Sequence, residues 1–89
     1  MTINAEVSLY PLRSSALSKP ISLFLDRLRG TALNVESGPM SSSLRGECLD
    51  LFRAVGDAFA RSAEEGDVVL VMKVSNACGL PGDSCDEER

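Results

Sequence analysis

The sequence contains no histidine and no tryptophan, and only three cysteines occur among its 89 residues. Without histidine there is no Ser-His or Cys-His nucleophile pair and no imidazole metal ligand. The sequence also lacks a glycine-rich phosphate-binding loop. We therefore expect a protein that is not an enzyme and that needs neither a metal nor a cofactor.

Long apolar segments and excess positive charge are missing as well. The longest apolar run, Val68 to Met72, is five residues long, whereas a membrane span needs about 20. The formal net charge of −4 opposes a phosphate backbone. Tyr10 is the one aromatic residue expected on an exposed sheet face, where single-stranded nucleic acid needs stacking platforms. The sequence thus predicts neither membrane insertion nor a nucleic-acid partner.

The three cysteines are Cys48, Cys78 and Cys85. An odd number of cysteines, together with the lack of an apolar leader in residues 1–20, favours a reducing, cytoplasmic location. Two interpretations of Cys78 and Cys85 remain open: structural thiols or a redox pair.

The length of the chain predicts one domain, which we place at residues 1–78, followed by a loosely ordered tail at 79–89 that is rich in Gly, Pro and acidic residues. A chain this short buries only about 60–65% of the surface that its unfolded form exposes. Its own core is thin, so we expect it to pair with copies of itself as a homodimer or homotetramer.

Four segments show the alternation of a strand with one buried face. Residues 2–10 place Ile3, Ala5, Val7 and Leu9 on one face. Further strands are expected at 33–36, 40–46 and 67–76. Their predicted inner faces include Met40, Ser42, Leu44 and Val74.

Two segments have the 3–4 residue spacing of apolar positions that is typical of helices. The first begins near Ser18 or Lys19, has Pro20 in its first turn and stops at Gly30. The second runs from about residue 47 to 65, and its predicted inward stripe includes Phe52.

The element order predicts a ferredoxin-like β-α-β-β-α-β sandwich of the α+β class. Its four-stranded antiparallel sheet carries both helices on one face, and the first strand lies between the third and the fourth. Val69 and Val71 would then lie on the opposite face, which suits packing between subunits.

Glu6 lies in the middle of the first strand, with Arg45 and Lys73 expected on neighbouring strands. A cross-strand ion pair is the favoured interpretation. A carboxylate that faces a cationic ligand is the alternative.

Small polar side chains gather at predicted strand ends, and in this topology distant ends can meet across the sheet. Such groups orient a ligand with donors and acceptors, but none is a credible general base. Ordinary capping hydroxyls are the alternative. The candidate ligand-binding residues are Ser8, Tyr10, Met40, Ser41, Ser42, Ser43, Ser75, Asn76 and Cys78.

Three segments resemble the YkoF-like thiamine-binding protein family: residues 8–12 (Ser-Leu-Tyr-Pro-Leu), 40–46 (Met-Ser-Ser-Ser-Leu-Arg-Gly) and 81–84 (Pro-Gly-Asp-Ser). The resemblance implies binding of thiamine (vitamin B1) or its hydroxymethylpyrimidine moiety. It also implies a supporting role in thiamine uptake or salvage, with a transporter component as an expected partner. Glu6 or Asp83 would complement the cationic thiazolium of thiamine.

Two other classes of function stay open. The chain would be an oligomeric interaction or regulatory module if the serine run were interface packing. An enzyme with an unrecognised site is the third alternative, and the missing bases speak against it.

Overall fold

The computed structural model describes residues 1–13 and 18–77. The strands are β1 (Thr2–Pro11), β2 (Asn34–Ser37), β3 (Ser42–Glu47) and β4 (Val68–Ser75), and the helices are α1 (Ser18–Arg29) and α2 (Cys48–Ala63). The predicted order of elements is confirmed, and each boundary differs from its prediction by no more than two residues. The predicted tail lies outside the described residues.

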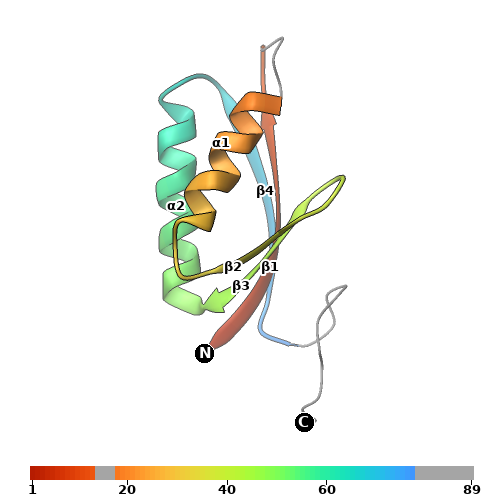
Figure 1. Cartoon of the computed structure of the whole chain (residues 1–89), viewed down its shortest axis with the longest axis vertical. Coiled ribbons are helices and arrows are strands. Elements are labelled where there is room, and N and C mark those ends of the chain that lie inside the picture. The colour runs from red at the N-terminus through yellow and green to blue at the C-terminus, as the bar shows by residue number, and fades with distance from the viewer. Residues whose placement is uncertain (14–17, 78–89) are drawn as a thin grey trace.

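The four strands form one antiparallel sheet in the order β2-β3-β1-β4. β1 is central, as predicted, with Val7 opposite Ser42 of β3 on one side and opposite Met72 of β4 on the other. Both helices cover the same face of this sheet (Figure 1). The predicted ferredoxin-like α+β sandwich is therefore confirmed.

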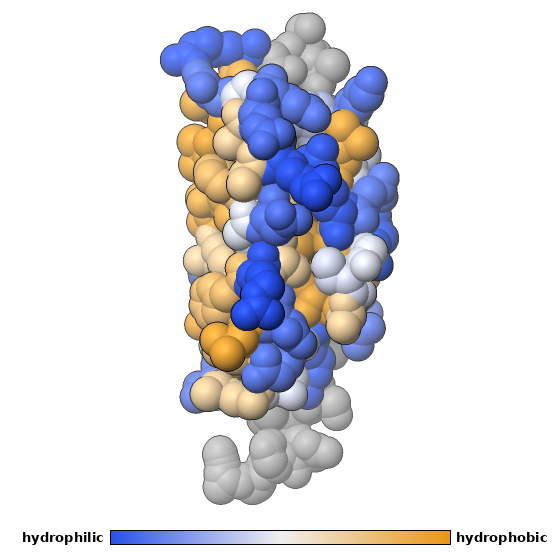
Figure 2. Space-filling view, turned by 90° about the vertical axis from the view of Figure 1, so that its left-hand side faces the viewer, coloured by the Kyte–Doolittle hydropathy of each residue, from blue (hydrophilic) through white to orange (hydrophobic). Residues whose placement is uncertain are grey.

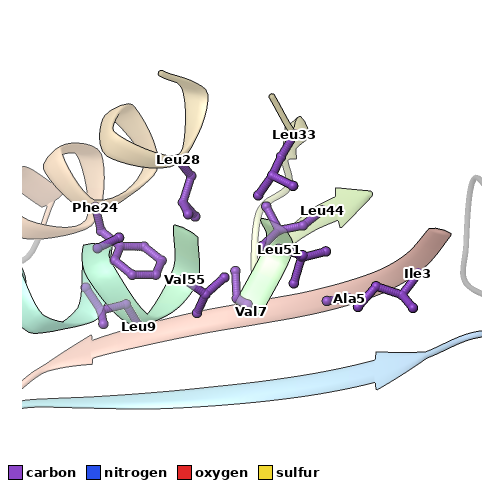
Figure 3. Close-up of a cluster of buried hydrophobic side chains, with 11 residues drawn as sticks. Ile3, Ala5, Val7, Leu9, Phe24, Leu28, Leu33, Leu44, Leu51 and Val55 are labelled. Atoms are coloured by element: carbon purple, nitrogen blue, oxygen red, sulfur yellow. The ribbon is translucent and has the colours of Figure 1, made fainter. Parts of the chain in front are cut away.

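The core lies between the helices and the sheet (Figure 3). The alternation of β1 sends every second side chain into it, and Phe24 of α1 is 1% exposed. Burial of a side chain of this size contributes about 1.5–3 kcal/mol relative to exposure. The core consists of Ile3, Ala5, Val7, Leu9, Phe24, Leu28, Leu33, Leu44, Leu51, Val55 and Ala58.

Glu47 caps the N-terminus of α2. Its Oε1 accepts hydrogen bonds from the backbone N–H groups of Leu49, at 2.9 Å, and Asp50, at 3.3 Å. These groups have no partner within the helix, so the carboxylate satisfies them. The bond from Asp50 lowers the pKa of Glu47 below its ordinary value; desolvation opposes this, and the bond from Leu49 and the charge of the Met1 amino group add to the lowering.

Three side chains predicted to point inward are exposed: Met40 (84%), Phe52 (48%) and Val74 (41%). Met40 precedes β3 and lies in the turn before it, so the alternation of the strand does not apply. Phe52 is turned by about 100° from the buried Leu51 around α2. Val74 belongs to β4, an outer strand of the sheet.

Gly46 of β3 lies directly against Leu33. A Cβ atom on Gly46 would overlap the Cδ2 atom of Leu33, so a larger residue here would force the side chain of Leu33 to move. The segment before β2 thus packs on the bare backbone of β3. Neither helix in the described part of the chain is long and apolar enough to cross a membrane.

Candidate functional site

A cavity of about 320 Å³ lies between the second half of β1, α1 and the turn that joins β2 to β3. We call it the β1–α1 cavity. Thirteen of the described residues line it, and none of these has a charged side chain. They are Val7, Ser8, Leu9, Tyr10, Pro11, Ile21, Phe24, Leu25, Gly38, Pro39, Met40, Ser41 and Ser42.

One wall of the β1–α1 cavity is the surface of the hydrophobic core. Leu9 and Phe24 are 6% and 1% exposed, and Phe24 reaches from α1 toward Leu9 of β1 (Figure 3). Ile21 and Leu25, on the same helix, are half-buried beside them. This wall offers an apolar surface to the flat face of a ring.

The opposite wall is the turn of residues 38–41, which two hydrogen bonds fix, with a third on the residue before it. The N–H of Gly38 donates to the carbonyl oxygen of Ser41 at 2.9 Å. A Cβ atom on Gly38 would lie 2.7 Å from the same oxygen, so glycine is required. The hydroxyl of Ser8 donates to the carbonyl oxygen of Met40 at 3.3 Å, and Arg29 donates to the hydroxyl of Ser37, which precedes the turn.

Ser42 is the most buried polar residue of the lining. It is 6% exposed and lies opposite Val7 on the helix-covered face of the sheet. Its hydroxyl makes no hydrogen bond within residues 1–13 and 18–77. A buried hydroxyl needs a hydrogen-bond partner, so Ser42 is a polar group of this cavity that is available to a ligand or to a water molecule.

Tyr10, Met40 and Ser41 flank the mouth of the cavity. Tyr10 is 51% exposed and lies opposite Val69 of β4. Met40 is 84% exposed, and Ser41 is half-buried. Five of the nine predicted residues, Ser8, Tyr10, Met40, Ser41 and Ser42, therefore line one cavity.

The structure does not bring the other described candidates to this cavity. Ser43 lies opposite Glu6, so its side chain is on the face away from the helices. Ser75 lies opposite Asn4, four residues from Ser8 along β1, which is about 13 Å at 3.3 Å per residue. The predicted convergence is wrong for Ser75 because antiparallel pairing puts the end of β4 beside the beginning of β1.

The end of β4 has a local structure of its own. The hydroxyl of Ser75 accepts a hydrogen bond from the N–H of Ala77 at 3.0 Å, which is an ordinary turn-forming arrangement. Asn76 is exposed beside it, away from the β1–α1 cavity. Cys78 lies outside the described residues.

Glu6 is engaged with a basic residue of the neighbouring strand. Its Oε1 lies 3.3 Å from Nζ of Lys73, directly opposite on β4, as the sequence predicted. Arg45 lies opposite Asn4 instead, and donates to its Oδ1 at 2.9 Å. The carboxylate of Glu6 therefore already has a cationic partner.

The sequence did not single out Ile21, Phe24, Leu25 and Gly38 as site residues, although all four line the cavity. The three apolar residues belong to a helical stripe that also packs on the core. Gly38 carried a usable signal, because Gly38-Pro39 marks a turn immediately before the serine run.

A second cavity, of about 420 Å³, lies near the ends of β1 and α2. It is larger, but its charged residues are already paired: Arg13 with Asp67, and Arg27 with Glu65 at 3.5 Å. The β1–α1 cavity, with its unpartnered hydroxyl, is therefore the stronger candidate. No cluster of metal-ligating side chains occurs in the part of the chain that the structure describes.

Comparisons with known proteins agree with this architecture. The model of the YKOF-related family matches residues 2–83. Hypothetical protein MJ1052 from Methanocaldococcus jannaschii is 25% identical, with a TM-score of 0.78 over 98% of this chain and 84% of that one. Protein SP2199 from Streptococcus pneumoniae is 19% identical, with a TM-score of 0.83 over 91% and 92%.

A further similar structure is the "putative thiamine biosynthesis/salvage protein" TM0486 from Thermotoga maritima. It is 14% identical to this chain, and its TM-score is 0.76 over 83% of this chain and 82% of that one. At this identity the likeness concerns the fold. No curated protein matches the sequence.

Proposed function

Because the chain belongs to the YKOF-related family, we propose that it binds thiamine or the hydroxymethylpyrimidine moiety of thiamine in the β1–α1 cavity. The binding supports thiamine uptake or salvage and involves no chemical conversion of the ligand. The name of the similar Thermotoga protein points to the same area of metabolism.

The buried hydroxyl of Ser42 is the observation that carries this proposal. It is a polar group in an otherwise largely apolar enclosure, and it has no hydrogen-bond partner within the described residues. An aminopyrimidine ring offers acceptor nitrogens and an amino group on its edge. One such group satisfies Ser42, while the half-buried Ile21 and Leu25 contact the ring face.

The thiazolium of thiamine stays outside the cavity, in solvent. The described residues of the lining include no carboxylate to stabilise a cation, and Glu6 is paired with Lys73. The sequence-based alternative for Glu6, a contact with the cationic ligand, is therefore not part of this proposal. The pyrimidine end provides the recognition.

The proposal of binding without catalysis rests on the same lining. Among the described residues, the lining includes Ser8, Tyr10, Ser41 and Ser42 but no carboxylate, amine or imidazole that could act as a general base. Groups of this kind orient and select a ligand. We place the protein in the cytoplasm, where a transporter component or a salvage enzyme exchanges the ligand with it.

We further propose that the chain works as a homodimer or homotetramer. The sheet face away from the helices carries Val69 (44% exposed) and Val71 (51% exposed) beside the Glu6–Lys73 pair. A face with apolar residues and charges of both signs suits packing against a copy of itself.

Isothermal titration calorimetry of the purified protein tests the proposed function. Thiamine, hydroxymethylpyrimidine and the isolated thiazole are titrated separately. We expect heat from the first two ligands and none from the thiazole. Absence of heat from both pyrimidine-containing ligands at high protein concentration contradicts the proposal.

A pure interaction module is the second candidate function. Figure 2 shows an apolar strip along one side of the face on which α2 lies, and Leu49 and Phe52 of α2 are 64% and 48% exposed. Exposed apolar surface of this kind marks contact sites between proteins. This function takes precedence if the calorimetry finds no ligand.

A further inference from the structure

β4 lies at one edge of the sheet, and within the described residues its outer side has no neighbouring strand. We propose that this open edge pairs, in antiparallel fashion, with β4 of a second copy of the chain, so that two sheets join into one. This interface is distinct from the sheet face that carries Val69 and Val71. It does not depend on the ligand of the β1–α1 cavity.

The hydrogen bonds between β1 and β4 define which backbone groups of β4 point outward. The N–H of Leu12 donates to the carbonyl oxygen of Asp67 at 2.9 Å, one step beyond the opposed residues Pro11 and Val68. In an antiparallel pair, hydrogen-bonded and non-hydrogen-bonded pairs of residues alternate. Pro11, which has no N–H, accordingly lies in a non-hydrogen-bonded pair. The residues of β4 whose N–H and C=O groups point away from β1 are therefore Val68, Leu70, Met72 and Val74.

The side chains of the same four residues are apolar and only partly covered. Val68, Leu70 and Met72 are half-buried, and Val74 is 41% exposed. Val7, which lies opposite Met72 on the central strand, is only 2% exposed. A strand added at this edge would thus bond to the outward backbone groups and cover the side chains of the same residues.

The two edges of the sheet differ in their protection against such pairing. β2, at the other edge, is a strand of four residues, and short edge strands are one of the ways in which proteins avoid unwanted pairing. β4 has eight residues, none of them Pro or Gly, and pairs with β1 without a bulge. Its one charged residue, Lys73, is paired with Glu6 at 3.3 Å. An edge this long and apolar indicates a strand that is paired in the assembled protein.

β4 is complementary to itself when two copies are related by a two-fold axis at Val71. Leu70 of one copy then lies opposite Met72 of the other, so residues with outward backbone groups face each other and form hydrogen-bonded pairs. Lys73 lies opposite Val69 rather than opposite a second Lys73, so no like charges meet. Such two-fold pairs are the commonest assemblies of identical chains, which favours a second copy over a foreign strand.

Amide hydrogen exchange, followed residue by residue by NMR, tests the pairing in assembled wild-type protein. The N–H groups of Val69 and Val71 are bonded to β1, so they are protected whether or not the edge is paired. We expect equal protection at Leu70 and Met72. Fast exchange at these two residues in the assembled protein, or a wild type that sediments as a monomer, overturns the inference.

Met72→Pro gives an independent readout, because it removes an outward N–H and leaves the hydrogen bonds between β4 and β1 in place. We expect the variant to keep the circular dichroism spectrum of the wild type and to sediment as a species of half the wild-type mass. Met72→Ala shortens the side chain but keeps the N–H, and it should assemble as the wild type does. A folded Met72→Pro with wild-type mass contradicts the inference, as does an equal loss of assembly in Met72→Ala. If Met72→Pro does not fold, the exchange at Leu70 and Met72 of the wild type decides.

Other occupants of the edge would give different results. Protection of Leu70 and Met72 only after a foreign peptide is added would assign the edge to another protein and contradict pairing between copies. Met72→Pro leaves the sheet face of Val69 and Val71 unaltered, so its smaller mass reports edge pairing alone.

Discussion

The hydroxyl of Ser8 donates a hydrogen bond to the carbonyl oxygen of Met40, 3.3 Å away and 32 residues further along the chain. This bond joins the central strand of the sheet to the turn of residues 38–41, which forms one wall of the β1–α1 cavity. Ser8 therefore supports the site by holding the turn in place.

Replacement of Ser8 by alanine removes this link. We expect Ser8→Ala to lose about 0.5–1.5 kcal/mol of stability and to bind the pyrimidine ligand severalfold more weakly, since the turn is less well fixed. Chemical denaturation and calorimetry measure the two effects. Ser8→Thr keeps the hydroxyl and is the matched control; a loss as large as that of alanine would argue against the link.

Ser42→Ala separates binding from folding. Removal of a buried hydroxyl without a partner leaves stability unchanged or raises it by up to about 1 kcal/mol. Ligand affinity should fall about tenfold or more, because the ligand loses a hydrogen bond within an enclosed site. A loss of stability with unchanged affinity would show that Ser42 is purely structural.

The neighbouring serine provides the control for this variant. Ser43 lies on the same strand but on the opposite face of the sheet. Ser43→Ala should therefore leave the affinity for hydroxymethylpyrimidine unchanged. An equal loss in both variants would mean that the ligand does not occupy the β1–α1 cavity.

Two glycine substitutions should act in opposite directions. Gly46→Ala brings a methyl group onto Leu33 and should destabilise the fold by about 1–3 kcal/mol. Gly56 lies within α2, and no atom lies within 4 Å of a Cβ built there. Gly56→Ala should stabilise by about 0.5–1 kcal/mol. The denaturation midpoints of the two variants are compared with that of the wild type. An unchanged midpoint for Gly46→Ala would contradict close packing between Gly46 and Leu33.

The hydrogen bonds of Glu47 predict that the stability of the fold depends on pH. Its pKa is lower in the folded protein than in the unfolded chain, chiefly because of the hydrogen bond from the N–H of Asp50. The unfolded chain therefore takes up the proton first as the pH falls. The stabilisation is fully present above the ordinary pKa of 4.5 and is lost as the pH falls through the lowered value.

Glu47→Gln makes this contribution measurable. Melting temperatures of the wild type and the variant should differ at pH 7 and converge toward pH 3. A constant difference over the whole range would mean that the charge of Glu47 has no part in capping α2.

The proposed subunit packing is tested with the double variant Val69→Lys and Val71→Lys. Two like charges on the exposed face should oppose contact with a second copy, so sedimentation should show a smaller species than in the wild type. Glu64→Lys, at the exposed C-terminal end of α2, changes the net charge by the same amount and is the control. An unchanged assembly in the double variant would exclude this face as the interface.

Regular features of the fold could be predicted from the sequence because they depend on local periodicity. The alternation of Ile3, Ala5, Val7 and Leu9 defined β1 and its buried face, and the Glu6–Lys73 pair followed from the topology. The position of Ser75 could not be predicted in the same way. The register of β1 and β4 is set by packing across the sheet, and it places Ser75 opposite Asn4.

The exposure of Met40 and the role of Phe24 are features of the candidate site that could not be predicted from the sequence either. Strand alternation assigned Met40 to the inner face, but the strand begins two residues later. Phe24 belongs to an apolar helical stripe, and no pattern in the sequence distinguishes a stripe residue that fills the core from one that also forms a cavity wall. Only the arrangement of the elements in space makes that distinction.

The cavity wall and the hydrophobic core share Leu9 and Phe24. A substitution that reshapes this wall therefore carries a cost in folding, whereas Pro39, Met40 and Ser41 of the turn change without disturbing buried packing. New ligand preferences are accordingly easier to acquire through the turn than through the wall. A library that varies residues 39–41 while keeping Leu9 and Phe24 would be the economical route to redirecting this scaffold toward other small aromatic molecules.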